Sequence, residues 1–217
     1  MIPQPHQDWV QQLLGHPAPE ESRSTCHSCP VSGPGKPFRA ELKCCGFVPE
    51  LPNFQAGALL EVPSVQARIA EGVMVGPRGL GRSPAYAARS SQTAFGRDQE
   101  LACPHLVDEG CSIWARREAV CASWFCRIDG GEAGQHFWEE LRRTLRVLEG
   151  RLAAHCAEGL DWPGLGPEAF YRACAEKAGS TSWKKLRTLG GFELRHRSRE
   201  LRAADRARLE AVSTPIG

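Results

Sequence analysis

The sequence predicts a mainly α fold in which a small, irregular, cysteine-rich metal-binding core packs on helices, with little or no sheet. Three observations carry this prediction. Apolar residues recur at helical spacing in several segments, no segment alternates strongly like a strand, and eight cysteines fall in two groups within loop-like sequence. A chain of 217 residues can bury a sizeable core without cross-links. We expect a cysteine-cluster domain at residues 1–130 and a helical C-terminal region at residues 131–217 that packs on it.

The predicted helices follow from apolar periodicity and from residues that favour helix ends. The clearest helix spans 135–158, where apolar residues recur from Phe137 to Leu152 with Arg and Glu between them. Ser112 suits a cap, Pro167 suits a first turn and Gly72 suits a stop. Further helices are predicted at 8–14, 63–71, 112–126, 167–178 and 195–211, with one or two turns at 183–189.

A basic, glycine-rich segment at residues 72–97 contains four arginines and no acidic residue. Its glycines crowd the first half, without a strand pattern before them or a helix pattern after them, which favours a long surface loop over a phosphate-binding loop. A solvated basic loop is the expected role, and binding of an anionic substrate is the alternative. The four arginines are Arg78, Arg82, Arg89 and Arg97.

Composition bounds the cellular setting of the chain. The first ten residues have neither a basic start nor an apolar run, and no stretch approaches the length of a transmembrane helix. We therefore expect a cytoplasmic protein with no membrane partner, in a reducing compartment where structural disulfides are rare. A net charge of +2 does not by itself favour a nucleic-acid partner. Ten cysteines in such a setting indicate metal binding or thiol redox chemistry.

Eight of the ten cysteines are candidate metal ligands. Cys26 and Cys29 have a C-x-x-C spacing that lets one tight loop aim two sulfurs at a single centre. Cys156 and Cys174 stand apart on predicted helices and are expected to behave as small buried hydrophobes. The eight candidates are Cys26, Cys29, Cys44, Cys45, Cys103, Cys111, Cys121 and Cys126.

The adjacent residues Cys44 and Cys45 raise a question of geometry. Neighbouring side chains in an extended chain point to opposite sides. Either the backbone turns sharply here, which Gly46 would assist, or the two thiols serve different metals.

The second cysteine group begins with "CPHLVDEGC" at 103–111, which predicts a loop or short hairpin with Asp-Glu-Gly at its turn. Cys111 is expected at a helix N-terminus, where the helix dipole favours a thiolate. Cys121 and Cys126 are five residues apart, which is about 140° of rotation on an ideal helix. The helix must therefore end before Cys126, or Cys126 must serve another purpose.

The cysteine pattern resembles the YkgJ-type CxxCxxCC family, whose members are described as zinc- or iron-chelating cysteine-cluster proteins. The second half of the family pattern is matched in order, with Trp114 in place of Tyr and Glu118 in place of Pro. In the first half, fourteen residues separate Cys29 from Cys44, where the family usually has a few. The resemblance covers residues 26–126. The matching residues of the second half are Cys103, Leu106, Gly110, Cys111, Ile113, Arg117 and Cys121.

The resemblance implies a metal or cluster as the bound group. The family's cysteine motif is similar to that of the bacterial flagellin lysine methylase, which implies an iron–sulfur cluster. Methyl transfer is not carried over, because the chain has no glycine fingerprint for a nucleotide-type methyl donor. Ligands dispersed over loops suit the four corners of a [4Fe-4S] cubane, whereas structural zinc prefers two short knuckles, so iron–sulfur is favoured over zinc. His27 and His105 lie inside the motifs and are expected to be neighbours of the site rather than ligands.

Three functions follow as hypotheses. The first is a metal-binding protein that holds an iron–sulfur cluster or zinc in a structural or redox role, with a possible redox partner. The second is an iron–sulfur-dependent enzyme that acts on an anionic small molecule at residues 72–97. The third is a zinc-stabilised interaction module that uses the C-terminal segment, where residues 183–217 hold nine Lys/Arg against four Asp/Glu. No paired general acid and base stands out to name catalytic residues.

Overall fold

The computed structural model describes residues 2–21, 29–72 and 74–213, which divide into two compact units built from discontinuous segments. Unit 1 comprises the described parts of Met1–His27, Ala119–Leu152 and Thr181–Gly217, and unit 2 comprises those of Ser28–Glu118 and Ala153–Ser180. Each unit thus combines residues from both sides of position 130, the boundary expected from the sequence.

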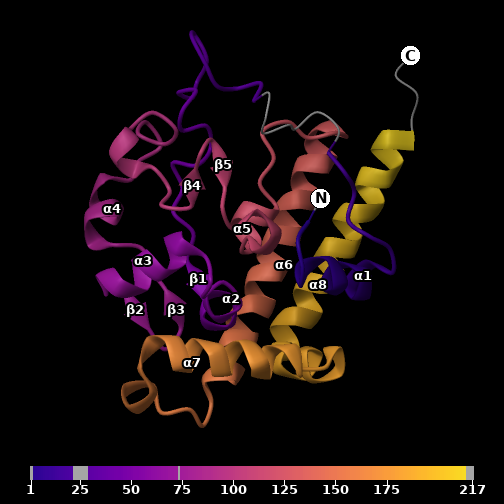
Figure 1. Cartoon of the computed structure of the whole chain (residues 1–217). Helices are drawn as coiled ribbons and strands as arrows, with labels where there is room; N and C mark the ends of the chain where they lie inside the picture. Colours follow the sequence, from indigo (N-terminus) through magenta and orange to yellow (C-terminus); the bar gives the residue numbers. More distant parts are fainter. Residues whose placement is uncertain (1, 22–28, 73, 214–217) are drawn as a thin grey trace. The chain divides into compact units, whose positions relative to one another are not determined.

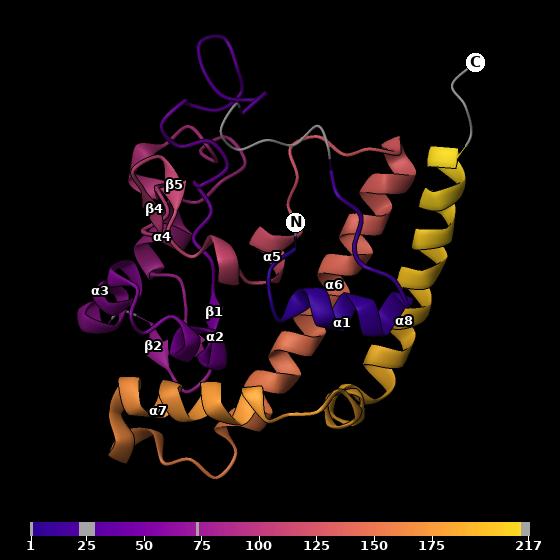
Figure 2. The same cartoon turned by 45° about the vertical axis from the view of Figure 1, so that its right-hand side comes forward.

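Unit 1 is built on long helices, which Figure 2 shows as α6 and α8 with α1 against α8. Buried apolar residues line α6 from Phe137 to Leu152, as the periodicity predicts. Gly191 interrupts α8 with φ 55° and ψ −138°, so the element contains two helical segments, in agreement with the separate segments predicted at 183–189 and 195–211. The helices of this unit are α1 (His6–Leu14), α5 (Ala119–Ala122), α6 (Gly131–Ala157, to Leu152 in this unit) and α8 (Trp183–Ser213).

Unit 2 combines shorter helices with two small antiparallel sheets. One sheet has the order β1 (Leu51–Pro52), β3 (Gly79–Leu80), β2 (Val75–Gly76), and the other pairs β4 (Leu106–Val107) with β5 (Gly110–Cys111). The helical elements are α2 (Asn53–Ala58), α3 (Pro63–Glu71), α4 (Pro84–Arg89), α7 (Trp162–Gly179) and the 3-10 turns η1 (Gln99–Leu101) and η2 (Trp114–Arg116).

Helix α2 packs closely on α7 within unit 2, and Figure 1 shows the two helices side by side. Gly57 allows the close approach, because a Cβ atom at this position would lie only 1.9 Å from the carbonyl oxygen of Tyr171. The buried Tyr171 hydroxyl lies 2.8 Å from the carbonyl of Gly76 and 3.0 Å from that of Gly79, and it accepts from the Gly76 N–H at 3.2 Å. Helix α7 therefore ties the small sheet to α2.

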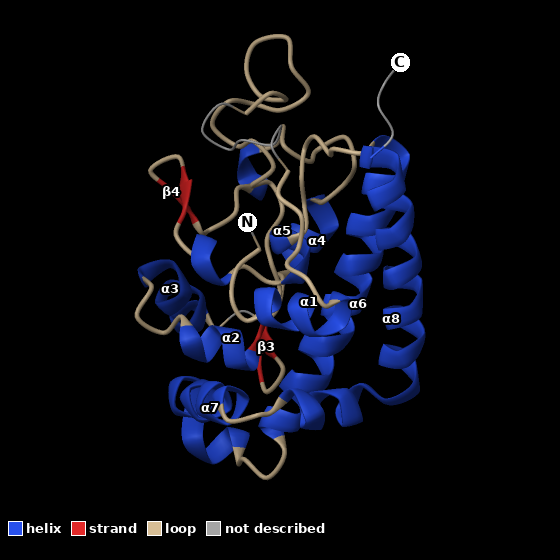
Figure 3. Cartoon of the chain, turned by 90° about the vertical axis from the view of Figure 1, so that its right-hand side faces the viewer, coloured by secondary structure: helices blue, strands red, loops and turns tan. Residues whose placement is uncertain are grey.

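The predicted mainly α fold with little sheet is confirmed, as Figure 3 shows by its short red strands among blue helices. Two local predictions are wrong. The segment 72–97 is not one long loop, because residues 75–80 form the β2–β3 hairpin and Pro84–Arg89 forms α4. The helix expected at 112–126 is broken, because Arg117 is extended (φ −62°, ψ 144°) between η2 and the four-residue α5.

No helix in the described part of the chain is both long enough and apolar enough to cross a bilayer.

Candidate metal centre

The candidate cysteines are distributed over both units. Five lie in unit 2 and two, Cys121 and Cys126, lie in unit 1, while Cys26 and the neighbouring His27 fall outside the described residues. The five in unit 2 are Cys29, Cys44, Cys45, Cys103 and Cys111.

The backbone turns sharply at Cys44 and Cys45, which answers the question that their adjacency raises. Lys43 has a positive φ of 55°, and the Cys45 N–H donates to the Leu42 carbonyl at 2.9 Å. The two thiols face each other, because the Cys44 thiol donates to the Cys45 sulfur, and this bond is the first cause that raises the Cys44 pKa. Burial is the second cause, and the charge of Arg117 opposes both. Both sulfurs are therefore available to one centre.

Cys103 and Cys111 flank the β4–β5 hairpin, so the hairpin predicted from "CPHLVDEGC" is confirmed. Asp108 and Glu109 have φ of 47° and 63°, which is the backbone of a two-residue turn with both central residues left-handed. Cys111 ends β5 and is not at the start of an α-helix, so the expected support from a helix dipole is wrong. The hairpin instead brings Cys111 close enough for its charge to raise the Cys103 pKa.

The Cys103 sulfur is surrounded by groups that would stabilise a thiolate. The His105 backbone N–H and the charge of the Arg68 guanidinium both act to lower the pKa of the Cys103 thiol, whereas the Leu106 N–H donates to the Cys103 carbonyl oxygen at 2.9 Å. Burial outweighs these effects and raises the pKa of Cys103 to about 11, so the thiol of the metal-free chain keeps its proton at neutral pH. A metal that binds here must displace that proton.

Two hydrogen bonds join the loop of Cys44 and Cys45 to the loop of Cys103 and Cys111. The Cys103 N–H donates to the Cys45 carbonyl at 2.7 Å, and the Lys43 ammonium donates to the Glu109 carbonyl at 3.4 Å. Figure 1 shows the resulting neighbourhood, in which the β4–β5 hairpin lies beside the chain that leads to β1. The thiol pair of one loop therefore adjoins the thiol pair of the other.

The thiol pairs do not form a closed site. Among residues 2–21, 29–72 and 74–213, no group of three or more His, Cys, Asp or Glu side chains is arranged to hold a metal ion.

His105 is fully buried in a polar chain that fixes its tautomer. Arg68 can only donate, so its Nη1 donates to His105 Nε2 at 3.0 Å, and the ring proton must sit on Nδ1. Nδ1–H then donates to Ser64 Oγ at 2.8 Å, Ser64 donates to Ser112 Oγ at 2.9 Å, and Ser112 donates to the His105 carbonyl at 3.1 Å. Burial and then the Arg68 charge lower the pKa of His105 to about 4, so the ring is neutral. Both ring nitrogens are occupied by protein partners, as a neighbour of the site requires.

Arg68, Ser64 and Ser112 are members of this neighbourhood that the cysteine motifs do not reveal. For Arg68 the helical spacing could have indicated burial. Arg68 follows Val65 by three residues and so shares the buried face of α3, where an arginine needs a specific partner.

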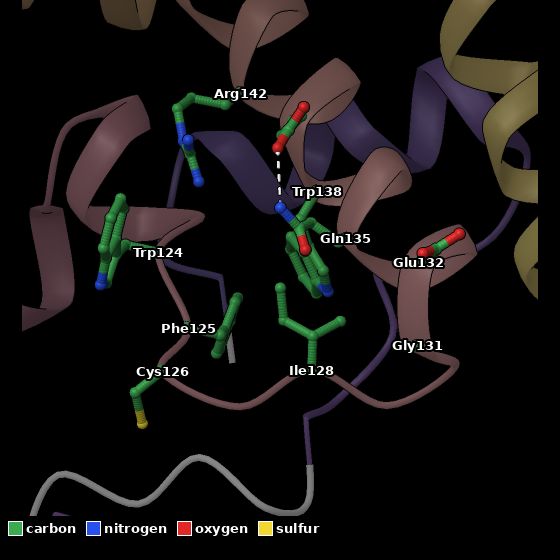
Figure 4. A pocket seen from close by; sticks show the side chains of 10 residues that line it. Trp124, Phe125, Cys126, Ile128, Gly131, Glu132, Gln135, Trp138 and Arg142 are labelled. Carbon is green, nitrogen blue, oxygen red and sulfur yellow. Dashed lines mark hydrogen bonds between the residues drawn. The ribbon is translucent and has the colours of Figure 1, made fainter. Parts of the chain in front are cut away.

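Cys121 and Cys126 belong to a different part of the chain. Cys121 lies in α5, which ends at Ala122, so the helix does end before Cys126. Cys126 lines a cavity of about 580 Å³ at the start of α6, and Figure 4 shows it below Trp124 and Phe125 at the edge of that cavity. Arg142 forms the opposite side, with Nε donating to Ser123 Oγ at 3.1 Å.

The four arginines of 72–97 do not converge on an anion site. The Arg82 Nε donates to the Val48 carbonyl at 2.7 Å, Arg89 pairs with carboxylates, and the Arg97 Nε donates to the Pro37 carbonyl at 3.0 Å. Arg78 is exposed beside the β2–β3 turn.

Cys156 and Cys174 are fully buried and free, as expected for small hydrophobic residues. Burial is the main cause that raises the pKa of Cys156 to about 12 and that of Cys174 to about 11. Each thiol therefore keeps its proton in the folded chain at pH values where the unfolded chain has lost it.

The stability of the protein should fall as the pH rises from about 9 towards 11 and 12. Between the ordinary and the raised pKa the folded state binds more protons, so the free energy of unfolding decreases with pH. Thermal unfolding in a reductant across this range measures the decrease. A Cys156→Ala/Cys174→Ala variant should show a shallower decrease, and an unchanged slope would contradict the assignment.

No protein-family model, no curated protein and no solved structure matches this chain.

Proposed function

We propose that the chain is a metal-binding protein that holds an iron–sulfur cluster, or alternatively zinc, through cysteine thiolates in a structural or redox role. The observation that carries the proposal is the joining of two thiol pairs, Cys44 with Cys45 and Cys103 with Cys111, by the Cys103 to Cys45 backbone bond. Thiolates are the ligands that zinc and iron–sulfur clusters share. Ten cysteines in one chain suit a reducing compartment such as the cytoplasm.

The protein groups around Cys103 support the proposal. The His105 backbone N–H and the charge of Arg68 both favour the deprotonated form of the Cys103 thiol that a metal needs. His105 and its hydroxyl partners hold the backbone that presents this N–H.

Complete ligation needs more than these contacts. The arrangement of the described residues supplies pairs, so metal binding would draw the pairs of unit 2 together, with Cys29 of the same unit as a further candidate donor. A bound cluster would supply one-electron transfer, and zinc would supply a cross-link between loops. Iron–sulfur remains the preferred cargo, because the thiols come from separate loops and not from two short knuckles.

The test is the metal content of the full chain purified without oxygen. The expected result is a coloured protein with iron and acid-labile sulfide. A colourless protein with stoichiometric zinc would replace the cluster with zinc, and a folded protein without any metal would reject both.

A second candidate function, polyanion binding in an interaction module, is favoured by one observation on α8. Four arginines recur at i, i+4, i+7 and i+11, which places them on one helix face, and we name this face the arginine ridge. Arg202 donates to the Leu13 carbonyl at 3.0 Å, and the other three are exposed. Phe192, 71% exposed, stacks on His196 beside the ridge, as in sites that bind bases and phosphates together. The ridge consists of Arg195, Arg199, Arg202 and Arg206.

Replacing Arg195, Arg199 and Arg206 with Gln should weaken binding of the chain to a mixed-sequence single-stranded oligonucleotide. Each arginine that contacts a phosphate releases counterions, so the slope of log K against log salt should become shallower by about 2 for the three changes. Fluorescence anisotropy over a salt series measures the slope. A matched triple on α6, with Arg143, Arg146 and Arg151 changed to Gln, should leave it unchanged. Equal effects of the two triples would reject a specific ridge.

The third hypothesis, an enzyme that acts on an anionic substrate at 72–97, has no specific observation in its favour, because three of the four arginines there have separate partners and Arg78 is exposed.

A further inference from the structure

The segment that follows α1, residues 16–21, runs from α8 to α6 within unit 1, and we name it the strap. Figure 2 shows it in the indigo tube that leaves the end of α1 beside α8. Pro17 and Pro19 have no N–H, and the Pro17 carbonyl is the one backbone group of the strap with a hydrogen-bond partner among the described residues. The other hydrogen bonds of the strap come from side chains at its two ends.

The far end of the strap is anchored by Glu21 on α6. Glu21 is 8% exposed, and its carboxylate accepts from the indole N–H of Trp138 and from the backbone N–H of Asp129. Both donors are neutral N–H groups that keep their hydrogens at every pH near neutrality. This anchor therefore has no donor that titrates in that range.

The near end is anchored by His16, whose ring contacts an acceptor at each nitrogen. Nε2 lies 2.8 Å from Asp205 Oδ2, and Nδ1 lies 2.9 Å from the Pro17 carbonyl oxygen, which can only accept. Asp205 is buried on α8, and its other oxygen accepts from Arg208 Nη2 at 3.2 Å, a charged partner that favours the accepting carboxylate. Both ring nitrogens of His16 must therefore donate, and only the imidazolium carries a hydrogen on each.

Loss of one proton from this ring breaks the near anchor. A neutral imidazole has a single hydrogen, so one of its nitrogens then turns a lone pair toward the oxygen that it had bonded. If Nε2 loses the hydrogen, the lone pair faces the carboxylate of Asp205, and if Nδ1 loses it, the lone pair faces the Pro17 carbonyl. In either case one hydrogen bond is replaced by a repulsive contact, and the remaining one is no longer charge-assisted.

Asp205 and Arg208, both on α8, are the charged side chains of the described residues that act on His16. The hydrogen bond to Pro17 is the largest cause that raises the pKa of His16, and Asp205 raises it further. Burial and the charge of Arg208 oppose this rise without cancelling it, so the pKa lies above its ordinary value of 6.5. The guanidinium of Arg208 lies over the Phe137 ring of α6 at 5.1 Å, so it stays in place when His16 changes charge.

We infer that His16 is a pH-sensitive latch, which fastens the strap to α8 when its ring is doubly protonated and releases that end when the ring is neutral. The inference goes beyond the proposed metal binding and does not depend on it. The latch is fully closed below pH 6.5 and opens as the pH rises through the raised pKa of His16. Because Glu21 keeps the other end on α6, release is a local opening of the strap and leaves the helices of unit 1 folded.

The test measures the order of Ala18, in the middle of the strap, by ¹³C relaxation of its methyl group in the full chain at pH 6 and pH 8.5. The wild type should give an order parameter of about 0.85 at pH 6 and below about 0.6 at pH 8.5. His16→Ala should be mobile at both pH values, because it removes both ring contacts. The ring signal of His16 should titrate above pH 6.5, and Asp205→Asn should lower that midpoint.

His155→Ala is the matched control, because His155 also pairs with a carboxylate, that of Glu158 at 3.1 Å, but on another segment of the chain. It should match the wild type at both pH values. A wild-type strap that is equally ordered at pH 6 and pH 8.5 overturns the inference, as does a His16→Ala chain with the order of the wild type at pH 6. If circular dichroism shows that Asp205→Asn is unfolded, His16→Ala decides, because it leaves Asp205 paired with Arg208.

Discussion

Replacing Cys103 with Ser should abolish stoichiometric metal binding and lower the stability of the chain by several kcal/mol, because the binding energy of a structural metal is also folding energy. Cys103 adjoins Cys111 across the hairpin, and its backbone N–H donates to the other cysteine loop. A serine hydroxyl keeps the size of the side chain but does not form the thiolate that zinc or iron needs. Metal analysis and thermal unfolding of the purified variant measure the two losses.

The matched control for this prediction is Cys174→Ala. Cys174 is also buried with a raised pKa, but it lies on α7 as an isolated hydrophobic thiol. Its replacement should keep the metal content of the wild type and cost only about 1 kcal/mol for the small cavity. If Cys103→Ser and Cys174→Ala lost metal equally, or if neither did, the hairpin would not be the binding site.

Replacing Gly57 with Ala should destabilise unit 2 by about 3 kcal/mol, since overpacking forces a backbone to move. The new Cβ would lie 1.9 Å from the Tyr171 carbonyl oxygen and 2.9 Å from the Ala175 Cβ. Neither neighbour can yield without shifting α7, which carries the Tyr171 hydroxyl that holds the small sheet. Chemical denaturation measures the change in the free energy of unfolding.

Gly150→Ala is the control, because a Cβ at Gly150 on α6 meets no atom within 4 Å. Alanine there should raise stability by about 0.5 to 1 kcal/mol through helix propensity alone. A Gly57→Ala chain as stable as the wild type would show that α2 and α7 do not pack as closely as described.

The long helices were predictable because their cores repeat at helical spacing. The apolar side of α6 and the start of α3 at Pro63 need no information beyond the local sequence. The β4–β5 hairpin was also predictable, because Asp108-Glu109-Gly110 is typical of a turn. The strands of the β2–β3 hairpin were not, since two residues each are too few to alternate.

The cysteines of the candidate site can be proposed from the sequence, whereas the residues that surround them cannot be predicted from it. Thiol spacing identifies Cys103 and Cys111, but the shared orientation of Cys44 and Cys45 depends on Lys43 in a left-handed conformation that few non-glycine residues adopt. The hydrogen bond between Arg68 and His105 joins residues 37 positions apart in the sequence, so no local pattern predicts it. Periodicity also failed between Ser112 and Cys126, where the extended Arg117 separates two short helical turns.

X-ray absorption at the edge of the bound metal tests the central claim most directly, because it counts the sulfur ligands and measures their distances. The account predicts a first shell dominated by sulfur at about 2.3 Å, with sulfur lost from that shell or the metal absent in Cys103→Ser. A first shell of nitrogen and oxygen, unchanged when Cys103 is replaced, would contradict it.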